Sequence, residues 1–158
     1  MTDTVRIRRA NYDDAEVIAD QRRLMFEEIY TDVDAPTMQA MRDGSVTWTR
    51  AQIEQGKYLG WLLVDEANEQ IIGGAGIWLM DWCPSPKELT GNRAYVLNVY
   101  VAPDYRKRGL ARSLMNALIA YSRHQRIALL SLHASEAGRP LYASLGFKGT
   151  NEMRVPLK

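Results

Sequence analysis

The fold is decided by residues 94–112, which read AYVLNVYVAPDYRKRGLAR. The first eight of these residues are mostly branched or aromatic, which is typical of a β-strand, and they are too apolar on both faces for an edge strand. We therefore expect residues 94–101 to lie in the centre of a sheet. Apolar side chains then recur at helical spacing from Leu110 to Tyr121, which predicts an amphipathic helix that begins near Gly109.

The turn between this strand and this helix is strongly basic. Four cations fall within seven residues, namely Arg106, Lys107, Arg108 and Arg112. The N-terminus of a helix leaves backbone N–H groups unpaired and carries a partial positive charge, so it can hold a pyrophosphate where small residues admit the ligand. Gly109 and Ala111 are small. The turn is therefore a candidate anion site, with an ordinary solvated basic turn as the alternative.

The N-terminal third of the chain predicts one strand and two or three helices. Residues 5–8 alternate apolar and charged side chains, which is typical of a half-buried strand. A helix follows, with Asp13 or Asp14 as its cap and with apolar side chains at Ala15, Ile18, Met25 and Ile29 on one face. Residues 35–56 predict one or two further helices broken near Gly44, the second of which Ser45 would start.

The rest of the chain predicts a mixed sheet. We expect a hairpin of residues 58–64 and 71–80 around a polar turn at 66–69, and a buried strand at 127–134. A short helix capped by Ser135 should run to Leu145, followed by a left-handed Gly146 and by Phe147, which folds back onto the helix. A last strand is expected around 153–155. A strand, a helix and a strand in that order imply a right-handed crossover between parallel neighbours. The expected fold class is therefore α/β (α+β), with an antiparallel first half and one parallel pair.

Composition favours one domain over residues 1–158. The chain is 46% hydrophobic and 25% charged, which is typical of globular proteins. The net charge of +1 argues against nucleic-acid and membrane-surface partners. Cys83 is the only cysteine, so no internal disulfide can form. The sequence also holds no metal-ligand motif, and no apolar run is long enough to span a membrane. We expect a cytoplasmic protein.

Two ordered motifs resemble those of the GNAT superfamily of N-acetyltransferases. The first is Val99-Tyr100-Val101-Ala102-Pro103 followed by Arg106-x-x-Gly109-x-Ala111, which is similar to the acetyl-CoA signature of that family. The second, at residues 141–147, reads LYASLGF and is similar to the family's later motif. The expected order of elements also matches the family over nearly the whole chain. The resemblance implies a GNAT-like, mostly antiparallel central sheet with one parallel strand pair and with helices on both faces.

The resemblance also implies how acetyl-CoA, the expected cosubstrate, would be held. The main chain at Val99 and Val101 would pair with the pantetheine arm, as an added strand does, where the central strand and the next one splay apart after a bulge. The N–H groups of residues 107–112 would hold the pyrophosphate. The candidate cofactor-binding residues are Val99, Tyr100, Val101, Arg106, Lys107, Arg108, Gly109, Leu110, Ala111, Arg112 and Ser135.

The reaction implied by the resemblance is direct attack of a neutral amine on the thioester through a tetrahedral intermediate. An N–H group near Val99 would stabilise the oxyanion, and Tyr142 would protonate the leaving sulfur. A buried packing role is the other interpretation of Tyr142. The central strand and the strand after it hold no carboxylate in residues 94–101 and 128–134. The candidate bases are Glu27, Glu28, Asp81, His133 and Glu152, and a water chain or a partly neutral amine needs none.

The acceptor is expected to be a primary amine of a small molecule or a peptide. Residues 22–50, the 79–93 loop and the C-terminal strand would build its pocket, and Glu27, Glu28 and Asp81 support the hypothesis of a cationic acceptor. The resemblance also allows for a homodimer. Two other functions stay open, namely a non-catalytic acyl-CoA-binding sensor and a phosphate or nucleic-acid binding module that uses residues 106–112.

Overall fold

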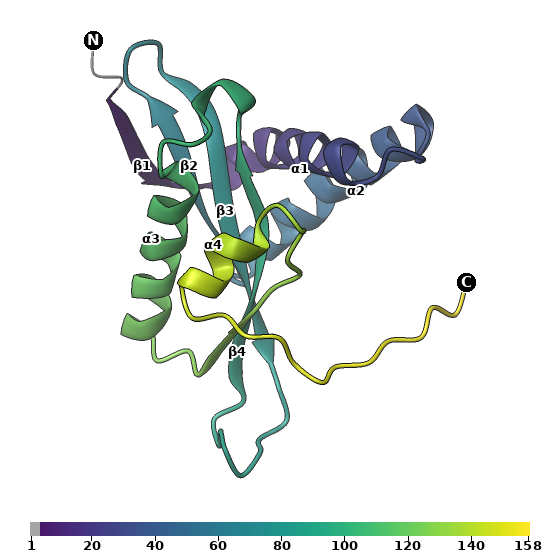
Figure 1. Ribbon diagram of the computed structural model, residues 1–158, viewed down its shortest axis with the longest axis vertical. Helices are drawn as coiled ribbons and strands as arrows, with labels where there is room; N and C mark the ends of the chain where they lie inside the picture. Colours follow the sequence, from purple (N-terminus) through teal and green to yellow (C-terminus); the bar gives the residue numbers. More distant parts are fainter. Residues whose placement is uncertain (1–3) are drawn as a thin grey trace.

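The computed structural model describes residues 4–158. Its centre is a five-stranded sheet with the strand order β1-β2-β3-β4-β5 (Figure 1). The strands are β1 (Val5–Arg9), β2 (Tyr58–Asp65), β3 (Gln70–Asp81), β4 (Asn92–Val101) and β5 (Leu129–Ser131). The first four strands pair antiparallel with their neighbours, and β5 pairs parallel with β4. The expected fold class and the expected β2–β3 hairpin are confirmed.

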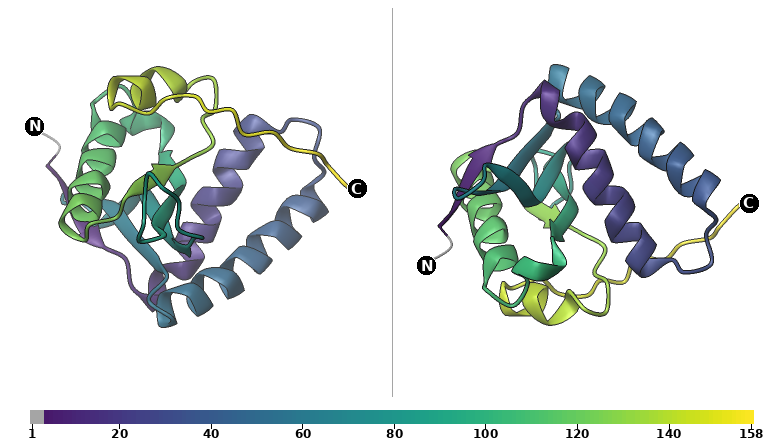
Figure 2. Two further views of the ribbon diagram at one scale, coloured as in Figure 1. Left: turned by 90° about the horizontal axis from the view of Figure 1, so that it is seen from below. Right: turned by 90° about the horizontal axis from the view of Figure 1, so that it is seen from above.

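Helices cover both faces of the sheet (Figure 2). They are α1 (Ala15–Ile29), α2 (Ala35–Glu54), α3 (Leu110–His124) and α4 (Arg139–Ser144), with short 3-10 helices η1 (Tyr12–Asp14) and η2 (Pro103–Tyr105). Leu114, Met115 and Leu118 of α3 are fully buried against one face, and Ile18 of α1 is buried against the other. None of the helices in residues 4–158 is long and apolar enough to cross a membrane.

Asp14 is the N-cap residue of α1, one of the two residues expected there, but its side chain makes no capping bond to α1, and a short helix, η1, precedes it with Asn11 as its cap. The side chain of Asn11 accepts from Asp13 N, and Asp14 returns a bond to Asn11 N at 2.8 Å, which is the reciprocal capping box. Arg8 also holds the Asp14 carboxylate with bonds of 2.7 and 2.8 Å. Asp14 is therefore a link between β1 and the start of α1.

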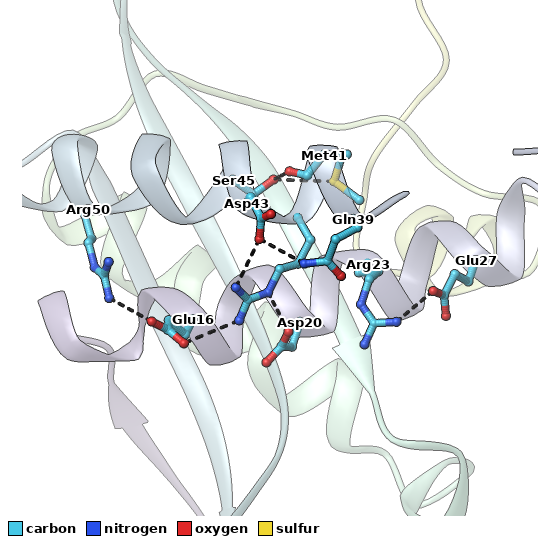
Figure 3. Close-up of polar contacts among 10 residues, drawn as sticks. Glu16, Asp20, Arg23, Glu27, Gln39, Met41, Asp43, Ser45 and Arg50 are labelled. Atoms are coloured by element: carbon cyan, nitrogen blue, oxygen red, sulfur yellow. Dashed lines mark hydrogen bonds and ion pairs between the residues drawn. The ribbon is translucent and has the colours of Figure 1, made fainter. Parts of the chain in front are cut away.

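Of the one or two helices expected in residues 35–56, one forms, and the expected break near Gly44 is wrong, since α2 is unbroken. Asp34 caps it by accepting from Thr37 N at 2.7 Å, and Ser45, the expected second start, bonds Met41 O one turn earlier. Two arginines of α2 form ion pairs with α1: Arg50 binds Glu16 at 3.3 Å (Figure 3), and Arg42 binds Asp20 at 2.8 Å. Contacts between helices thus outweigh the low helical propensity of one glycine.

The position of β4 and the length of β5 differ from expectation. β4 is the fourth of five strands rather than the central one, and β5 is three residues long instead of spanning 127–134. Leu129 is 44% exposed, so β5 is not buried. The chain leaves the sheet after Ser131, and β5 has a strand neighbour on one side only among residues 4–158. β4 therefore has partners on both sides over 93–95 alone.

The C-terminal end of the chain also departs from expectation. The structure forms α4 and places Gly146 in the left-handed region, with φ of 95°, as expected. The expected Ser135 cap is wrong, because the helix begins later with Gly138 at its N-cap, and Ser135 Oγ instead accepts from Gly138 N at 3.1 Å. Phe147 packs against Tyr142 as expected, with ring centroids 6.0 Å apart. The last strand around 153–155 does not form, since no hydrogen-bonding neighbour runs beside it. Residues 150–158 extend outward from the body instead (Figure 1).

Candidate active site

The parallel pair β4–β5 opens into a cleft of about 630 Å³. Pairing covers Arg93 to Tyr95 only, so the side of β4 that faces away from β3 has no strand partner in residues 96–101. Ala102 N–H donates to Ile72 O, and the alternation of an antiparallel ladder therefore turns the N–H and C=O of Val101 away from β3. The cleft thus exposes a short, unpaired strand edge.

The cleft brings together all the predicted site residues except Arg108. Those lining it are Val99, Tyr100, Val101, Arg106, Lys107, Gly109, Leu110, Ala111, Arg112, Ser135 and Tyr142. They come from β4, from the loop after it, from the first turn of α3 and from the segment that leads through α4. Glu28, one of the candidate bases, lines it too, and six further residues line the cleft without having been predicted: Met25, Ile29, Tyr105, Ala137, Gly138 and Leu141.

A β-bulge in β4 lies next to the cleft at Asn98. The register against β3 shifts between Gly74 and Gly76, and Asn98 has φ of +59°. Val96 and Val99 consequently both pack toward the α3 face, although they are three residues apart. The bulge, which the resemblance implies, is thus located at Asn98. Asparagine is the residue type besides glycine that best tolerates this conformation, and its place in an apolar strand was the available signal.

Buried hydrogen bonds hold both ends of the Asn98 side chain. Arg22 of α1 donates to Asn98 Oδ1 at 2.8 Å, and Asn98 Nδ2 donates to Tyr58 Oη at 3.1 Å. Burial raises the pKa of Tyr58 to about 12 and lowers the pKa of Arg22. A Cβ on Gly76 would collide with the Tyr58 hydroxyl, so this glycine lets the tyrosine reach across β3. The bulge is therefore fixed by three elements before any ligand binds.

The N-terminus of α3 closes one end of the cleft. Lys107 and Gly109 have φ of 62° and 76°, and Gly109 is the N-cap with no side chain to cap the helix. The first backbone bond of α3 runs from Ser113 N to Gly109 O at 3.0 Å. The N–H groups before Ser113 thus lack an intrahelical acceptor, as at every helix start. They form a cradle for an anion within a basic loop.

The basic side chains around this cradle have different partners. Arg106 Nε donates to Val101 O at 2.8 Å, and its guanidinium binds Glu28 at 2.6 Å. Glu28 in turn raises the pKa of Arg106. Arg112 donates to Ser144 Oγ at 2.7 Å, and Arg108 donates to Asp104 O at 2.9 Å. Arg106 therefore joins the loop to β4 and to α1. Its partner in α1, Glu28, lies 78 residues away in the sequence, so no local pattern predicts this contact.

Tyr142 lines the cleft from α4. Its ring rests over Gly138, where a Cβ would approach the ring to 2.9 Å, and its other neighbour is Phe147. Burial raises the pKa of Tyr142 above its usual value. The described residues provide no hydrogen-bond acceptor for its hydroxyl. Tyr142 thus presents a protonated phenol to the cleft.

Of the candidate bases, Glu28 alone lines the cleft, and there it is bound to Arg106. Glu27 pairs with Arg23 at 2.8 Å. His133 and Glu152 line a second groove on the other side of β5. Asp81 is exposed at the end of β3. The structure therefore brings neither His133 nor Glu152 to the cleft.

Comparison with known proteins points in one direction. The profile of the Acetyltransferase (GNAT) family matches residues 16–147, which confirms the resemblance found in the two motifs. The structure is similar to that of a GCN5-related N-acetyltransferase from Ralstonia eutropha, with 35% identity, a TM-score of 0.88 and coverage of 98% of this chain and 99% of that one. A predicted acetyltransferase with acetyl-CoA from Clostridium acetobutylicum is 25% identical, with a TM-score of 0.85 and coverage of 98% and 97%.

A curated relative gives a partial match. Glucosamine 6-phosphate N-acetyltransferase of Trypanosoma brucei brucei is 33% identical over 91 residues, which is 56% of this chain. The matched stretch spans 58% of that protein, so little more than half of its length is shared.

Proposed function

Because the chain belongs to the GNAT family of acetyltransferases, we propose that it transfers the acetyl group of acetyl-CoA to a primary amine of a small molecule. The observation that carries this proposal is one continuous cleft, in which the unpaired edge of β4 leads to the uncapped N-terminus of α3. A strand edge binds an extended amide-containing chain, and a helix N-terminus binds phosphate. Acetyl-CoA carries both groups, since its amide-containing pantetheine arm is joined directly to its pyrophosphate.

The residues present fit this cosubstrate. The N–H groups of Lys107 to Arg112 would hold the pyrophosphate, and the backbone of Val99 and Val101 would pair with the pantetheine arm. Because Val101 O already accepts from Arg106, the pairing at that residue would use its N–H. Ser135 lines the same cleft and would be a further contact for the arm. When bound, acetyl-CoA supplies the activated acetyl group.

The bulge would place a donor at the reaction centre. Val99 follows Asn98 and faces the cleft, so its N–H would donate to the oxygen on which negative charge develops. Removing one such preorganised donor from an enzyme typically costs about 3–4 kcal/mol of transition-state stabilisation. The bonds from Arg22 and to Tyr58 hold the bulge in place, so the donor needs no rearrangement when the substrate arrives.

Tyr142 would protonate the departing sulfur. The raised pKa keeps its hydroxyl protonated at neutral pH, and the hydroxyl has no competing acceptor among the described residues. A thiol has an ordinary pKa of about 8.5 and a phenol one of about 10, so proton transfer from Tyr142 to the departing thiolate is uphill by about 2 kcal/mol, and the raised pKa of Tyr142 adds to this cost. Amine deprotonation is assigned to solvent water, since the Glu28 carboxylate is held by Arg106.

The acceptor proposed is a small-molecule amine. Glu27 and Glu28, which supported a cationic acceptor, are neutralised by Arg23 and Arg106, and that reason no longer holds. The Trypanosoma brucei relative is named for an amino sugar phosphate. Amino sugars and their phosphates are therefore the first amines to test, followed by aminoglycosides and peptide amines.

The test combines turnover with binding. Release of free thiol from acetyl-CoA is measured over the amine panel for the wild type, for Tyr142→Phe and for the matched control Tyr30→Phe, whose ring lies outside the cleft. We expect Tyr142→Phe to lose turnover by about 10²-fold or more while acetyl-CoA still binds, and Tyr30→Phe to behave as the wild type.

Two results would overturn the proposal. Tight acetyl-CoA binding without turnover of any amine would favour the sensor, and absence of acetyl-CoA binding would refute the role of the cleft. Binding of duplex DNA in place of acetyl-CoA, with steep salt dependence, would favour the basic binding module.

A further inference from the structure

Arg22 of α1 is a half-buried cation with no carboxylate partner in the described part of the chain. Its Nη1 donates to Asn98 Oδ1 at 2.8 Å, and its guanidinium lies 4.6 Å from the centre of the Phe26 ring. Burial lowers the pKa of Arg22, and no carboxylate among residues 4–158 offsets this effect. An arginine nevertheless keeps its charge at neutral pH. The structure therefore holds a positive charge beside the bulge without its counter-ion.

The four carboxylates of α1 are all bound to other arginines. These pairs are Glu16 with Arg50, Asp20 with Arg42, Glu27 with Arg23 and Glu28 with Arg106, of which the first and the third are labelled in Figure 3. Every other arginine of α1 and α2 belongs to one of these pairs. Since removing a charge from water is unfavourable unless it is paired, Arg22 differs from its neighbours in needing a partner from outside.

Arg22 lies beside the expected reaction centre. It bonds Asn98, which directly precedes Val99, the residue whose N–H would stabilise the oxyanion. Met25 and Ile29 follow Arg22 on the same face of α1, and both line the acetyl-CoA cleft. The Nε and Nη2 groups of Arg22 have no acceptor among residues 4–158, and neither is sealed from solvent. A molecule that reaches the acetyl group can therefore also reach these N–H groups.

Support of the bulge does not explain the charge of Arg22. Asn98 Oδ1 receives one hydrogen bond from it, and a neutral amide donor would supply that bond without placing a charge between α1 and β4. The two free donors, Nε and Nη2, form one edge of the planar guanidinium. This edge is the one that binds two oxygens of a carboxylate or a phosphate side by side.

We propose that the acceptor amine carries an anionic group, a phosphate or a carboxylate, which Arg22 binds beside the reaction centre. This inference rests on the proposed acetyl transfer and adds to it the charge of the acceptor. The bound anion supplies the counter-ion that Arg22 lacks. Because the anion and the amine belong to one small molecule, its binding also holds the amine near the acetyl group, which lowers the entropic cost of the reaction.

The test compares amines that differ in the anionic group. Acetyl transfer is measured for glucosamine 6-phosphate against glucosamine, and for phenylalanine against phenylalaninamide, with each rate expressed per neutral amine. The first pair reports on a phosphate and the second on a carboxylate. We expect kcat/KM of the wild type to favour the anionic member of at least one pair by about 10-fold or more, as the strength of a charged hydrogen bond implies.

Arg22→Gln separates anion binding from support of the bulge. Glutamine keeps an amide donor for Asn98 and removes the charge, so we expect the preference for the anionic amine to disappear, whereas Arg22→Lys should keep part of it. A purely structural role would lower kcat/KM equally for both members of a pair and leave their ratio unchanged. The matched control is Arg23→Gln, the next residue in α1, which binds Glu27 and should keep the wild-type ratio.

Calorimetry makes the test independent of turnover. Glucose 6-phosphate and 3-phenylpropionate keep the anion but lack the amine, and at least one should bind the wild type in the presence of CoA and fail to bind Arg22→Gln. Equal use of neutral and anionic amines by the wild type overturns the proposal, and so does a preference that survives Arg22→Gln. If Arg22→Gln does not fold, the ratio in the wild type and in Arg22→Lys decides.

Failure of the proposed function has a different signature. Absence of turnover with every amine would overturn acetyl transfer, while anion binding that depends on Arg22 would still support the anion site. Acetyl-CoA binding by Arg22→Gln reports separately on the cleft, because Arg22 does not line it.

Discussion

Asn98 carries the sharpest prediction about stability. Replacement by alanine removes the bond from the charged Arg22 donor, which is 2.8 Å long, and the bond to the buried Tyr58 hydroxyl. A hydrogen bond to a charged group contributes about 1.5–3 kcal/mol and a neutral one about 0.5–1.5 kcal/mol. Alanine at φ of +59° adds a further cost of about 1–2 kcal/mol, because its Cβ crowds the following carbonyl.

Glycine at the same position isolates the backbone contribution. Asn98→Gly loses the same two hydrogen bonds but adopts the left-handed conformation freely. We expect Asn98→Ala to destabilise the protein by about 3–6 kcal/mol and Asn98→Gly to be less destabilising by about 1 kcal/mol. In an ordinary strand position the order is reversed, since glycine there is less stable than alanine by about 0.5–1 kcal/mol.

The assay is urea denaturation of the wild type and both variants, followed by tryptophan fluorescence and by circular dichroism. The difference in unfolding free energy between the two variants tests the left-handed backbone at the bulge. The loss of unfolding free energy that both variants share, relative to the wild type, tests the two hydrogen bonds of the Asn98 side chain. If alanine is as stable as glycine at position 98, the positive φ assigned there is wrong. If both variants are as stable as the wild type, Arg22 and Tyr58 do not hold the strand as described.

Three other perturbations have defined outcomes. Asp14→Asn should make the unfolding free energy depend less on pH below about pH 4. Arg8 lowers the pKa of Asp14, so the stability that this carboxylate provides is lost as the pH falls through that lowered value. Urea midpoints measured across pH test this, and the same pH dependence in the variant as in the wild type would contradict it. Leu118→Ala should cost about 2–5 kcal/mol of unfolding free energy, since Leu118 is fully buried under the sheet, and a loss below 1 kcal/mol, about half the least expected, would contradict its place in the core. Gly109→Ala should weaken acetyl-CoA binding in calorimetry and should lower the unfolding free energy by about 1–2 kcal/mol, because alanine is strained at the φ of 76°. The control Gly44→Ala, inside α2, should raise the unfolding free energy by about 0.5–1 kcal/mol. Equal effects of the two substitutions on stability would refute the left-handed conformation at Gly109.

The sequence predicts the β4–α3 unit well because its signals are local. Eight mostly apolar residues, a basic turn and an apolar row at helical spacing each depend on neighbours within a few positions. The hairpin and the short helix α4 were predictable for the same reason, although Gly138 and not Ser135 is the N-cap residue of α4. Residues that line the cleft from this unit were found, since the loop and the helix start are continuous in sequence.

The parts that sequence reasoning missed depend on partners far along the chain. Glu28 reaches Arg106 and Arg22 reaches Asn98 only after the sheet has formed. Gly44 stays helical because α1 and α2 are joined by Arg42 and its carboxylates. Residues 153–155 have the pattern of a strand, but they pair with no strand among the described residues. The local sequence pattern predicts which secondary structure a segment favours, and contacts with distant segments decide whether that structure forms.

The most direct measurement of the central claim is amide hydrogen exchange of the whole chain with and without acetyl-CoA. The cleft predicts new protection at two separate places, the backbone of Val99 to Val101 and the amides of Lys107 to Arg112, with no change along β1. Adenosine 3′,5′-bisphosphate, which lacks the pantetheine arm, should leave Val99 to Val101 unprotected. Protection confined to the groove beside β5, or none at either place, would contradict the assignment of the cleft to acetyl-CoA.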